Sequence, residues 1–361
     1  MALQLEQLQW QEPLVPEVVD PAWEDELRSL FGMVPGAFRR ISSSAWVREA
    51  YLDFVRAPLQ AISRAEMELA GLVTSQENAC RYCYGSARVR MKMIGFSDEM
   101  IDRIEHNAQL VEADPREREL VKFCRNLARS KPRPSREARE ALHAVGFTPL
   151  ATAELAVMVA VVGFCNRVST LLAVPPDVEM EAEGRKMKGM WSKLTAWLPR
   201  KQDMTLPPPV YPPATFAGPY GNVLRGLEGS PATAVLEASL NRAFSSPRLP
   251  RRTVSLMFAV VARTLDCALC EINAAALLED EGFARTQLDE VLATLGSPAL
   301  TDAEALLVPW ARDTVWMPEQ PARIQERTRP LVDALGPDTV IEAVGTAALA
   351  NGCVRLTMLQ V

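Results

Sequence analysis

The sequence predicts an all-α protein. Apolar residues recur at steps of three and four over long segments, as on the buried face of a helix. The alternation of apolar and polar residues typical of half-buried strands is absent, and most glycines stand near segment ends, where helices terminate. In the first half of the chain the helical pattern covers residues 45–63, 63–76, 98–112, 116–130 and 151–174.

The chain also repeats itself at a fixed spacing. Adding 187 to the C-x-x-C pair Cys80 and Cys83 gives a second pair, Cys267 and Cys270. Further pairs are separated by 187 or, near the end of each half, by 188: Arg64 and Arg251, Gly95 and Gly282, Phe96 and Phe283, Glu154 and Glu342, Cys165 and Cys353, Arg167 and Arg355. These spacings predict a tandem duplication of one helical domain.

We therefore expect three parts, which are a first repeat at 1–176, a linker at 177–214 and a second repeat at 215–361. Two proline clusters mark the linker. A basic amphipathic helix in its middle could lie on a membrane surface, but packing on one repeat is the commoner outcome for such a pattern. Its apolar residues are Met187, Met190, Trp191, Leu194, Trp197 and Leu198.

Composition and charge argue against several classes of protein. The 361 residues are 48% hydrophobic and 23% charged with a net charge of -6, so the basic excess of a nucleic-acid-binding protein is missing. The first 20 residues lack the pattern of a secretory signal. The longest apolar run, 155–165, is shorter than the ~20 residues of a membrane span and predicts a buried helix.

Seven cysteines are an odd number, and too few for a disulfide scaffold in a chain of this length. We therefore expect a cytoplasmic protein in a reducing compartment. In that setting a C-x-x-C pair more often carries redox chemistry or binds a metal than cross-links the fold.

The first C-x-x-C pair has a setting suited to thiol chemistry. Glu68 lies twelve residues before Cys80, on a helix expected to break at residues 75–78, so Cys80 falls near the start of the next helix. A helix N-terminus and nearby cations lower the pKa of a thiol, and Arg81 and Arg88 are the candidate cations. The two cysteines share one helical face, close enough for a disulfide.

The spacing E-x11-C-x-x-C followed by a helix resembles the alkylhydroperoxidase D-like family, within the carboxymuconolactone decarboxylase superfamily. The resemblance is nearest to the peroxidase-related branch and runs through both repeats. In the first repeat it covers residues 32–38, 59–83, 95–96 and 164–174.

This resemblance implies a small helical domain that forms homo-oligomers, so a trimer of this chain would match a hexamer of single domains. It also implies a redox cycle that needs no cofactor and no metal. Cys83 attacks a small peroxide, Cys80 resolves the sulfenic acid as a disulfide, and a dithiol protein reduces that disulfide. Glu68 would begin a proton relay.

The sequence departs from the family motif at one position in each repeat. The family usually has a histidine four residues after the second cysteine, where this chain has Ala87 and, in the second repeat, Ala274. A relay would then need Tyr84, Ser86, water or another chain, and none is as good a base near neutral pH.

The second repeat keeps both cysteines but not their surroundings. Ser255 replaces the glutamate, and Asp266 and Glu271 flank the pair with negative charge, which raises a thiol pKa. We expect Cys267 and Cys270 to be vestigial, in a repeat that serves mainly as a structural partner of the first.

Two alternatives concern the cysteines alone. The two C-x-x-C pairs together could supply four thiolate ligands to zinc, but their separation in the sequence does not match a zinc ribbon. Cysteine is also a common core residue, and this is the favoured interpretation of Cys124, Cys165 and Cys353.

Two further alternatives change the function. One keeps the fold but turns over a specialised small substrate, as decarboxylases or lyases do, in a pocket lined by Glu68, Tyr82, Tyr84 and Arg167. Arg167 would bind an anionic substrate or, as we favour, pair with a buried carboxylate such as Glu68. The other is a non-catalytic scaffold with degenerate sites.

Overall fold

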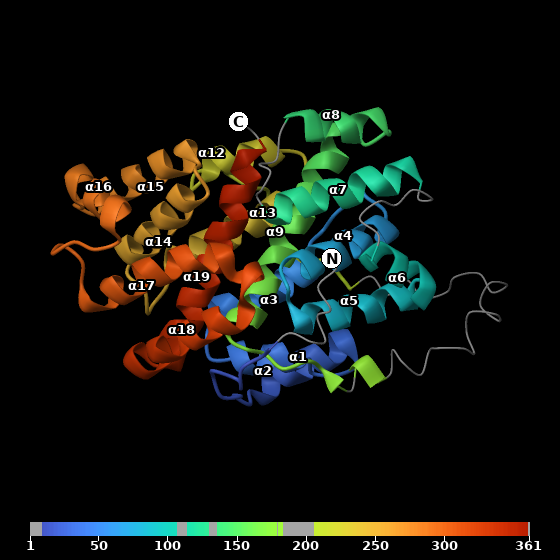
Figure 1. Ribbon diagram of the computed structural model, residues 1–361, viewed down its shortest axis with the longest axis horizontal. Coiled ribbons are helices and arrows are strands. Elements are labelled where there is room, and N and C mark those ends of the chain that lie inside the picture. Colours follow the sequence, from blue (N-terminus) through green and yellow to red (C-terminus); the bar gives the residue numbers. More distant parts are fainter. Residues whose placement is uncertain (1–8, 107–113, 130–135, 179, 183–205, 360–361) are drawn as a thin grey trace.

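The computed structural model describes residues 9–106, 114–129, 136–178, 180–182 and 206–359. Every regular element in these described ranges is an α-helix or a short 3-10 helix, which confirms the all-α prediction (Figure 1). The helices of the first half are α1 (Pro21–Phe31), α2 (Gly36–Ile41), α3 (Ala45–Val55), α4 (Arg64–Glu77), α5 (Arg81–Met93), α6 (Asp98–His106), α7 (Pro115–Arg129), α8 (Arg136–Ala144) and α9 (Pro149–Leu171).

The second half follows the linker. Its elements are α12 (Gly221–Leu224), η2 (Arg225–Leu227), α13 (Ala232–Ala243), α14 (Arg251–Thr264), α15 (Ala268–Asp280), α16 (Arg285–Thr294), α17 (Asp302–Asp313), η3 (Thr314–Glu319), α18 (Pro321–Leu335) and α19 (Pro337–Met358).

The helix boundaries follow the spacing found in the sequence. Helices α14 to α17 each begin 187 residues after α4 to α7 in turn, and α19 begins 188 residues after α9. The backbone agrees too, because Ala79 and Asp266, each just before the first cysteine of a pair, both have a positive φ, 50° and 56°. This agreement is consistent with the predicted duplication, while the domain limits stay a prediction.

Two expected helix ends lie elsewhere, and a third lies outside the described residues. The predicted helix 45–63 stops at Val55, because Pro58 cannot continue it and disfavours helical backbone just before it. Helix α4 runs through the expected break at 75–78 as far as Glu77. Helix α6 ends at His106, and the rest of the expected helix lies outside the described residues, as do the linker residues 187–198.

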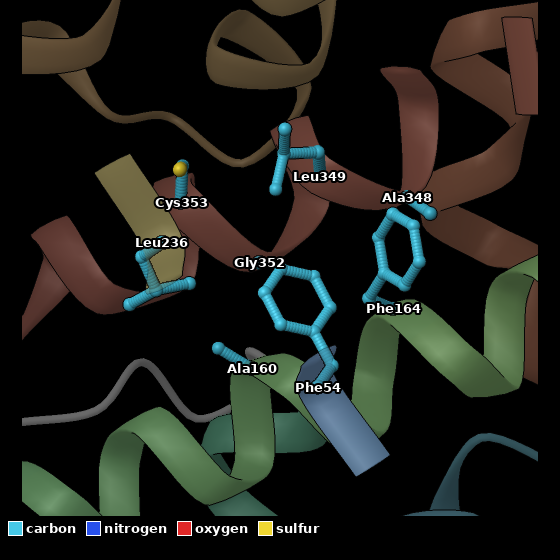
Figure 2. A pocket seen from close by; sticks show the side chains of 8 residues that line it. All are labelled: Phe54, Ala160, Phe164, Leu236, Ala348, Leu349, Gly352 and Cys353. Atoms are coloured by element: carbon cyan, nitrogen blue, oxygen red, sulfur yellow. The ribbon is translucent and has the colours of Figure 1, made fainter. Parts of the chain in front are cut away.

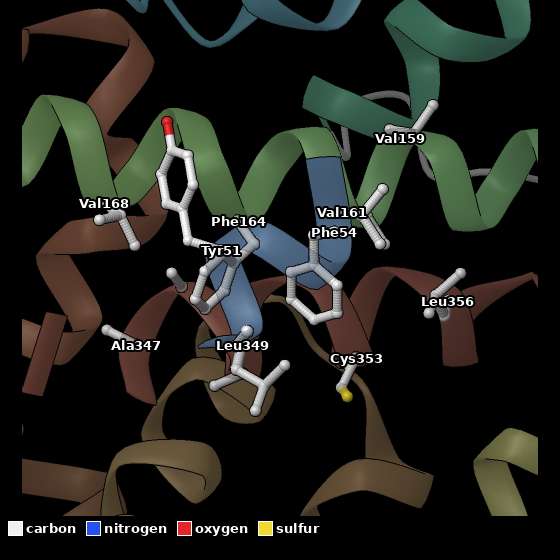
Figure 3. Close-up of a cluster of buried hydrophobic side chains, with 14 of the residues drawn as sticks. Tyr51, Phe54, Val159, Val161, Phe164, Val168, Ala347, Leu349, Cys353 and Leu356 are labelled. Atoms are coloured by element: carbon white, nitrogen blue, oxygen red, sulfur yellow. The ribbon is translucent and has the colours of Figure 1, made fainter. Parts of the chain in front are cut away.

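Two long helices, α9 and α19, lie side by side at the centre of the molecule (Figure 1). Side chains from both halves pack around them in one continuous core, which includes Tyr51 and Phe54 of α3 (Figure 3). A smaller core fills the space between α14, α15, α16 and α17. The two halves are therefore held together by a shared apolar interior.

Where α9 and α19 cross, a cavity of about 10 Å³ remains, bounded by apolar surfaces from four helices (Figure 2). This volume holds about one water-sized particle, and an apolar cavity of that size stays dry. Its lining residues are Phe54, Ala160, Phe164, Leu236, Ala348, Leu349, Gly352 and Cys353. The crossing is thus a packed core and not a ligand site.

Helix α9 is long and apolar enough to cross a membrane by length and composition. In this structure 67% of its most apolar stretch is buried, and a core helix passes the same test, so the feature is weak evidence for a span. The burial agrees with the buried helix expected at 155–165.

Buried carboxylates on the central helices also join the two halves. On α9, Glu154 accepts hydrogen bonds from the amides at 60–61 (2.9 and 2.6 Å) and from the Ser230 hydroxyl of the second half (3.2 Å). On α19, Glu342 accepts one from the Ser44 hydroxyl of the first half (3.3 Å). Each half therefore supplies a carboxylate that fixes a connecting segment of the other.

Candidate active site

Cys80 and Cys83 lie at the start of α5, as the sequence predicts. Cys80 is the N-cap residue, and its sulfur accepts a hydrogen bond from the backbone amide of Cys83 (3.3 Å). The two sulfur atoms are 2.7 Å apart, with both side chains buried at 0% and 8% exposed. Both cysteines are free thiols, close enough for a disulfide to form with a small movement.

The surroundings of Cys83 favour its thiolate. Burial is the largest influence and acts to raise its pKa. Hydrogen bonds from Cys80, Asn166 and Ser169 act in the other direction. The positive charge of Arg90 adds to them, and together they hold the pKa of Cys83 below its usual value.

Cys80 behaves in the opposite way. Burial, and the hydrogen bond that its thiol donates to Cys83, raise the pKa of Cys80 well above the ordinary value. The pair therefore consists of one sulfur that favours the thiolate and one that keeps its proton. Thiol chemistry needs this division between a nucleophile and a second thiol that attacks later.

Arg90 owes its position to Glu68. The buried carboxylate of Glu68 forms ion pairs with Arg90 (2.8 Å) on α5 and with Arg64 (2.5 Å) on its own helix. Glu68 thus acts on the thiols through Arg90, and its described partners are arginines and not the sulfur atoms. Arg90 was not identified in the sequence analysis. Arg90 stands seven residues after Cys83, so the two side chains lie on one face of α5.

The cations expected from the sequence play other parts. Arg88 forms ion pairs with Asp98 (3.6 Å) and Asp102 (3.0 Å) of α6 and lies over the ring of Tyr84. Its charge is therefore balanced by carboxylates of α6. Arg81 is partly exposed at the first position of α5. The expectation that Arg81 and Arg88 supply the cation beside the thiol is corrected, since Arg90 does so.

Tyr82 and Ser86 are buried beside the pair. The Ser86 hydroxyl donates to the backbone carbonyl of Tyr82 (3.2 Å), which occupies it within the helix. Burial and the nearby charge of Cys83 raise the pKa of Tyr82, so its phenol stays protonated. The hydroxyl of Tyr84 accepts from Arg88 (3.2 Å).

Helix α9 supplies polar groups that the sequence analysis missed. The hydroxyl of Ser169, which hydrogen-bonds Cys83, lies 3.1 Å from the hydroxyl of Tyr51 on α3. Asn166 donates to the Ser75 hydroxyl (3.1 Å), which fixes its amide against α4. A signal for both was present, because Asn166 and Ser169 are polar residues in a predominantly apolar helix.

Arg167 does not pair with Glu68. It is buried, donates to the backbone carbonyl of Gly163 (3.3 Å), and its Nε and Nη2 have no hydrogen-bond partner in the described part of the chain. Burial lowers its pKa to about 10. The expected ion pair is therefore wrong, and the four residues of the alternative pocket have separate partners.

Cys267 and Cys270 have the same place at a helix start as Cys80 and Cys83, but no arginine stands at the position of Arg90. The sulfur atoms of Cys267 and Cys270 are 2.8 Å apart at the start of α15. The hydrogen bond that the Cys270 thiol makes to Cys267, together with burial, raises the pKa of Cys270 far above its ordinary value. At the positions of Glu68 and Arg90 this half has Ser255 and Leu277.

The expected cause of a raised pKa in the second pair needs correction. Glu271 forms an ion pair with Arg263 (2.7 Å), so its charge is largely balanced. Burial and the neighbouring thiol account for the raised pKa of Cys270 instead. In the described residues no group of three or more histidine, cysteine, aspartate or glutamate side chains could hold a metal ion, so the four-thiolate zinc site is not formed there.

Comparisons with known proteins add little. No protein-family model and no curated protein matches the chain. A solved structure that resembles it is the alkylhydroperoxidase AhpD core of an uncharacterized peroxidase-related protein from Ralstonia eutropha JMP134. The identity is 22% and the TM-score 0.43, over 48% of this chain and 98% of that chain. At that identity and TM-score the likeness does not establish the family.

Proposed function

We propose that this protein is a cysteine-based oxidoreductase that reduces small peroxides through Cys83 and Cys80. The observation that supports this most is the division within the first pair. Cys83 has a lowered pKa beside the protonated thiol of Cys80, so one sulfur is a candidate nucleophile and the other a candidate resolving thiol.

In the first step the Cys83 thiolate attacks the terminal oxygen of the peroxide. The S–O bond forms as the O–O bond breaks, which leaves a sulfenic acid and an alcohol or water. The departing oxygen needs a proton, and the hydroxyls of Ser169 and Tyr51 form a chain that can carry it. This chain would stand in for the histidine that Ala87 replaces.

In the second step the Cys80 sulfur attacks the sulfur of the sulfenic acid at Cys83. The S–S bond forms as the S–O bond breaks, water leaves, and both cysteines end as a disulfide. A dithiol protein then reduces the disulfide and is itself oxidised. We propose that the reaction takes place in a reducing compartment, in a homo-oligomer of the chain.

Stoichiometric oxidation tests the proposal. Wild-type protein treated with one equivalent of hydrogen peroxide should lose two thiols and yield a Cys80–Cys83 disulfide in a peptide map, and dithiothreitol should restore them. Cys83→Ser should consume peroxide far more slowly, and the matched variant Cys270→Ser should behave like wild type. Equal consumption by wild type and Cys83→Ser would reject peroxide reduction.

A further inference from the structure

The second half contains a cavity of about 190 Å³ between the C-terminal ends of α14 and α16 and the end of α17. Part of its wall is apolar and part carries guanidinium groups. It is lined by Val260, Arg263, Thr264, Leu292, Ala293, Leu295 and Arg312. It lies far along the chain from the thiol site and has no part in the chemistry proposed above.

In the first half an ion pair joins the corresponding ends of α4 and α7. Glu77, at the end of α4, pairs with Arg125 of α7 (3.1 Å) and also with Arg129, and its side chain is only 7% exposed. Arg125 donates in addition to the backbone carbonyl of Ile104 in α6 (3.2 Å). A protein carboxylate thus joins the ends of these helices.

The second half keeps the arginine and loses the carboxylate. The offset of 187 carries Arg125 to Arg312 but Glu77 to Thr264, whose shorter side chain leaves space. The Thr264 hydroxyl donates to the carbonyl of Val260 within its own helix (2.7 Å). Arg312 is 40% exposed and pairs with the adjacent Asp313 (2.7 Å).

Two arginines line the cavity, and only one of them has a carboxylate to itself. Arg263 is paired with Glu271, whereas Arg312 shares Asp313 with Arg327, which is not a lining residue. The open cavity and this shared carboxylate coincide where the first half has a glutamate.

We propose that this cavity binds a small aliphatic monocarboxylate, whose carboxylate occupies the place of the Glu77 side chain. Arg312 would hold the carboxylate through paired N–H donors, the geometry that suits a guanidinium. The aliphatic chain would lie against Val260 and Leu292. The volume of about 190 Å³ is far larger than the one-water space of about 10 Å³ between α9 and α19, and it has room for acids of two to four carbons.

Titration with acetate, propionate and butyrate tests the proposal, by isothermal calorimetry and at ionic strength held constant with sodium chloride. We expect saturable binding that tightens with chain length. Arg312→Gln should weaken butyrate binding at least about tenfold, since hydrogen bonds to charged groups contribute this much. The control Arg285→Gln, which alters an arginine paired with Asp289 on α16, should bind as wild type does.

Thr264→Glu restores the carboxylate of the first half and is the sharpest variant. It should abolish butyrate binding and raise the melting temperature, because Arg312 regains an internal partner. The proposal is overturned if wild type shows no saturable binding, if chloride competes as well as butyrate, or if Arg312→Gln binds butyrate as wild type does. Circular dichroism of each variant separates loss of binding from loss of folding.

Discussion

Arg90→Leu should raise the pKa of the Cys83 thiol. This substitution places in the first half the residue that the second half carries as Leu277. It removes the cation that favours the Cys83 thiolate and leaves the hydrogen bonds from Cys80, Asn166 and Ser169 in place. The change therefore separates the effect of charge from that of hydrogen bonding.

The size of the effect follows from the position of Arg90. An opposite charge close to an ionisable group shifts its pKa by about 1–3 units. Arg90 is 39% exposed, so solvent screens its charge, and its influence on Cys83 is smaller than that of the hydrogen bonds. We therefore expect a rise of about one unit, or about 1.4 kcal/mol, and a tenfold lower thiolate fraction below the pKa.

A second variant controls for the carboxylate left behind. In Arg90→Leu the buried Glu68 keeps Arg64 as its one ion-pair partner among the described residues, and its negative charge would itself raise the pKa of Cys83. Arg90→Leu combined with Glu68→Ser reproduces the Ser255 and Leu277 of the second half. The double variant should show the smaller rise of the two.

The assay is the pH dependence of alkylation by iodoacetamide, with the Cys83 peptide quantified by mass spectrometry. Arg88→Gln is the matched control, because this arginine lies on the same helix but pairs with Asp98 and Asp102. Its alkylation profile should coincide with that of wild type. An unchanged Cys83 pKa in both Arg90 variants would refute the assignment of Arg90 as the cation.

Three other predictions concern stability. Gly345→Ala should lower the free energy of unfolding by about 1–3 kcal/mol in urea denaturation, because its Cβ would lie 2.7 Å from Trp46 and Val47. Gly71→Ala, whose Cβ would meet nothing nearer than 3.7 Å in a helix, should leave stability equal or raise it by up to about 1 kcal/mol. Burial raises the pKa of Cys353 to about 12, above its unfolded value of about 8.5, so this thiol stabilises the fold fully below about pH 8.5 and progressively less as pH rises toward 12. Stability measured from about pH 8 to 10 should therefore fall less steeply in Cys353→Ala than in wild type, and equal slopes would contradict the buried, protonated thiol.

The sequence predicts the fold well because its helices are long and strongly periodic. Helix ends were less predictable, since they depend on local detail such as Pro58 and the cap at Asn78. The start of α5 was predictable, because its N-cap coincides with the motif itself. The spacing that found the second pair also recurs in the helix boundaries, which periodicity within one segment could not show.

The candidate site was predictable where its residues lie on α5 or, for Glu68, on the preceding helix α4. The spacing of Cys83 and Arg90 could have identified the cation. Arg81 and Arg88 were chosen instead, because they are nearer to the cysteines in the sequence. Asn166 and Ser169 come from α9, more than 80 positions away, and only the packing of α9 against α5 brings them to the sulfur. No spacing rule within one segment connects residues so far apart.

The alanine in the motif has a structural meaning that the sequence did not reveal. Ala87 is fully buried, at 0% exposed, so a histidine there would displace core side chains before it could act as a base. The position of Ala87 therefore has no room for the histidine side chain of the family motif, and replacing the alanine alone would not restore a proton relay. The thiolate of Cys83 depends on hydrogen bonds from α9 and on the charge of Arg90. The second half lacks that charge, and its pair has the same backbone geometry with a raised pKa at Cys270. Helix geometry brings the sulfurs together in both halves, whereas the lowered pKa of Cys83 depends on hydrogen bonds from Cys80, Asn166 and Ser169 and on the charge of Arg90 in its own helix.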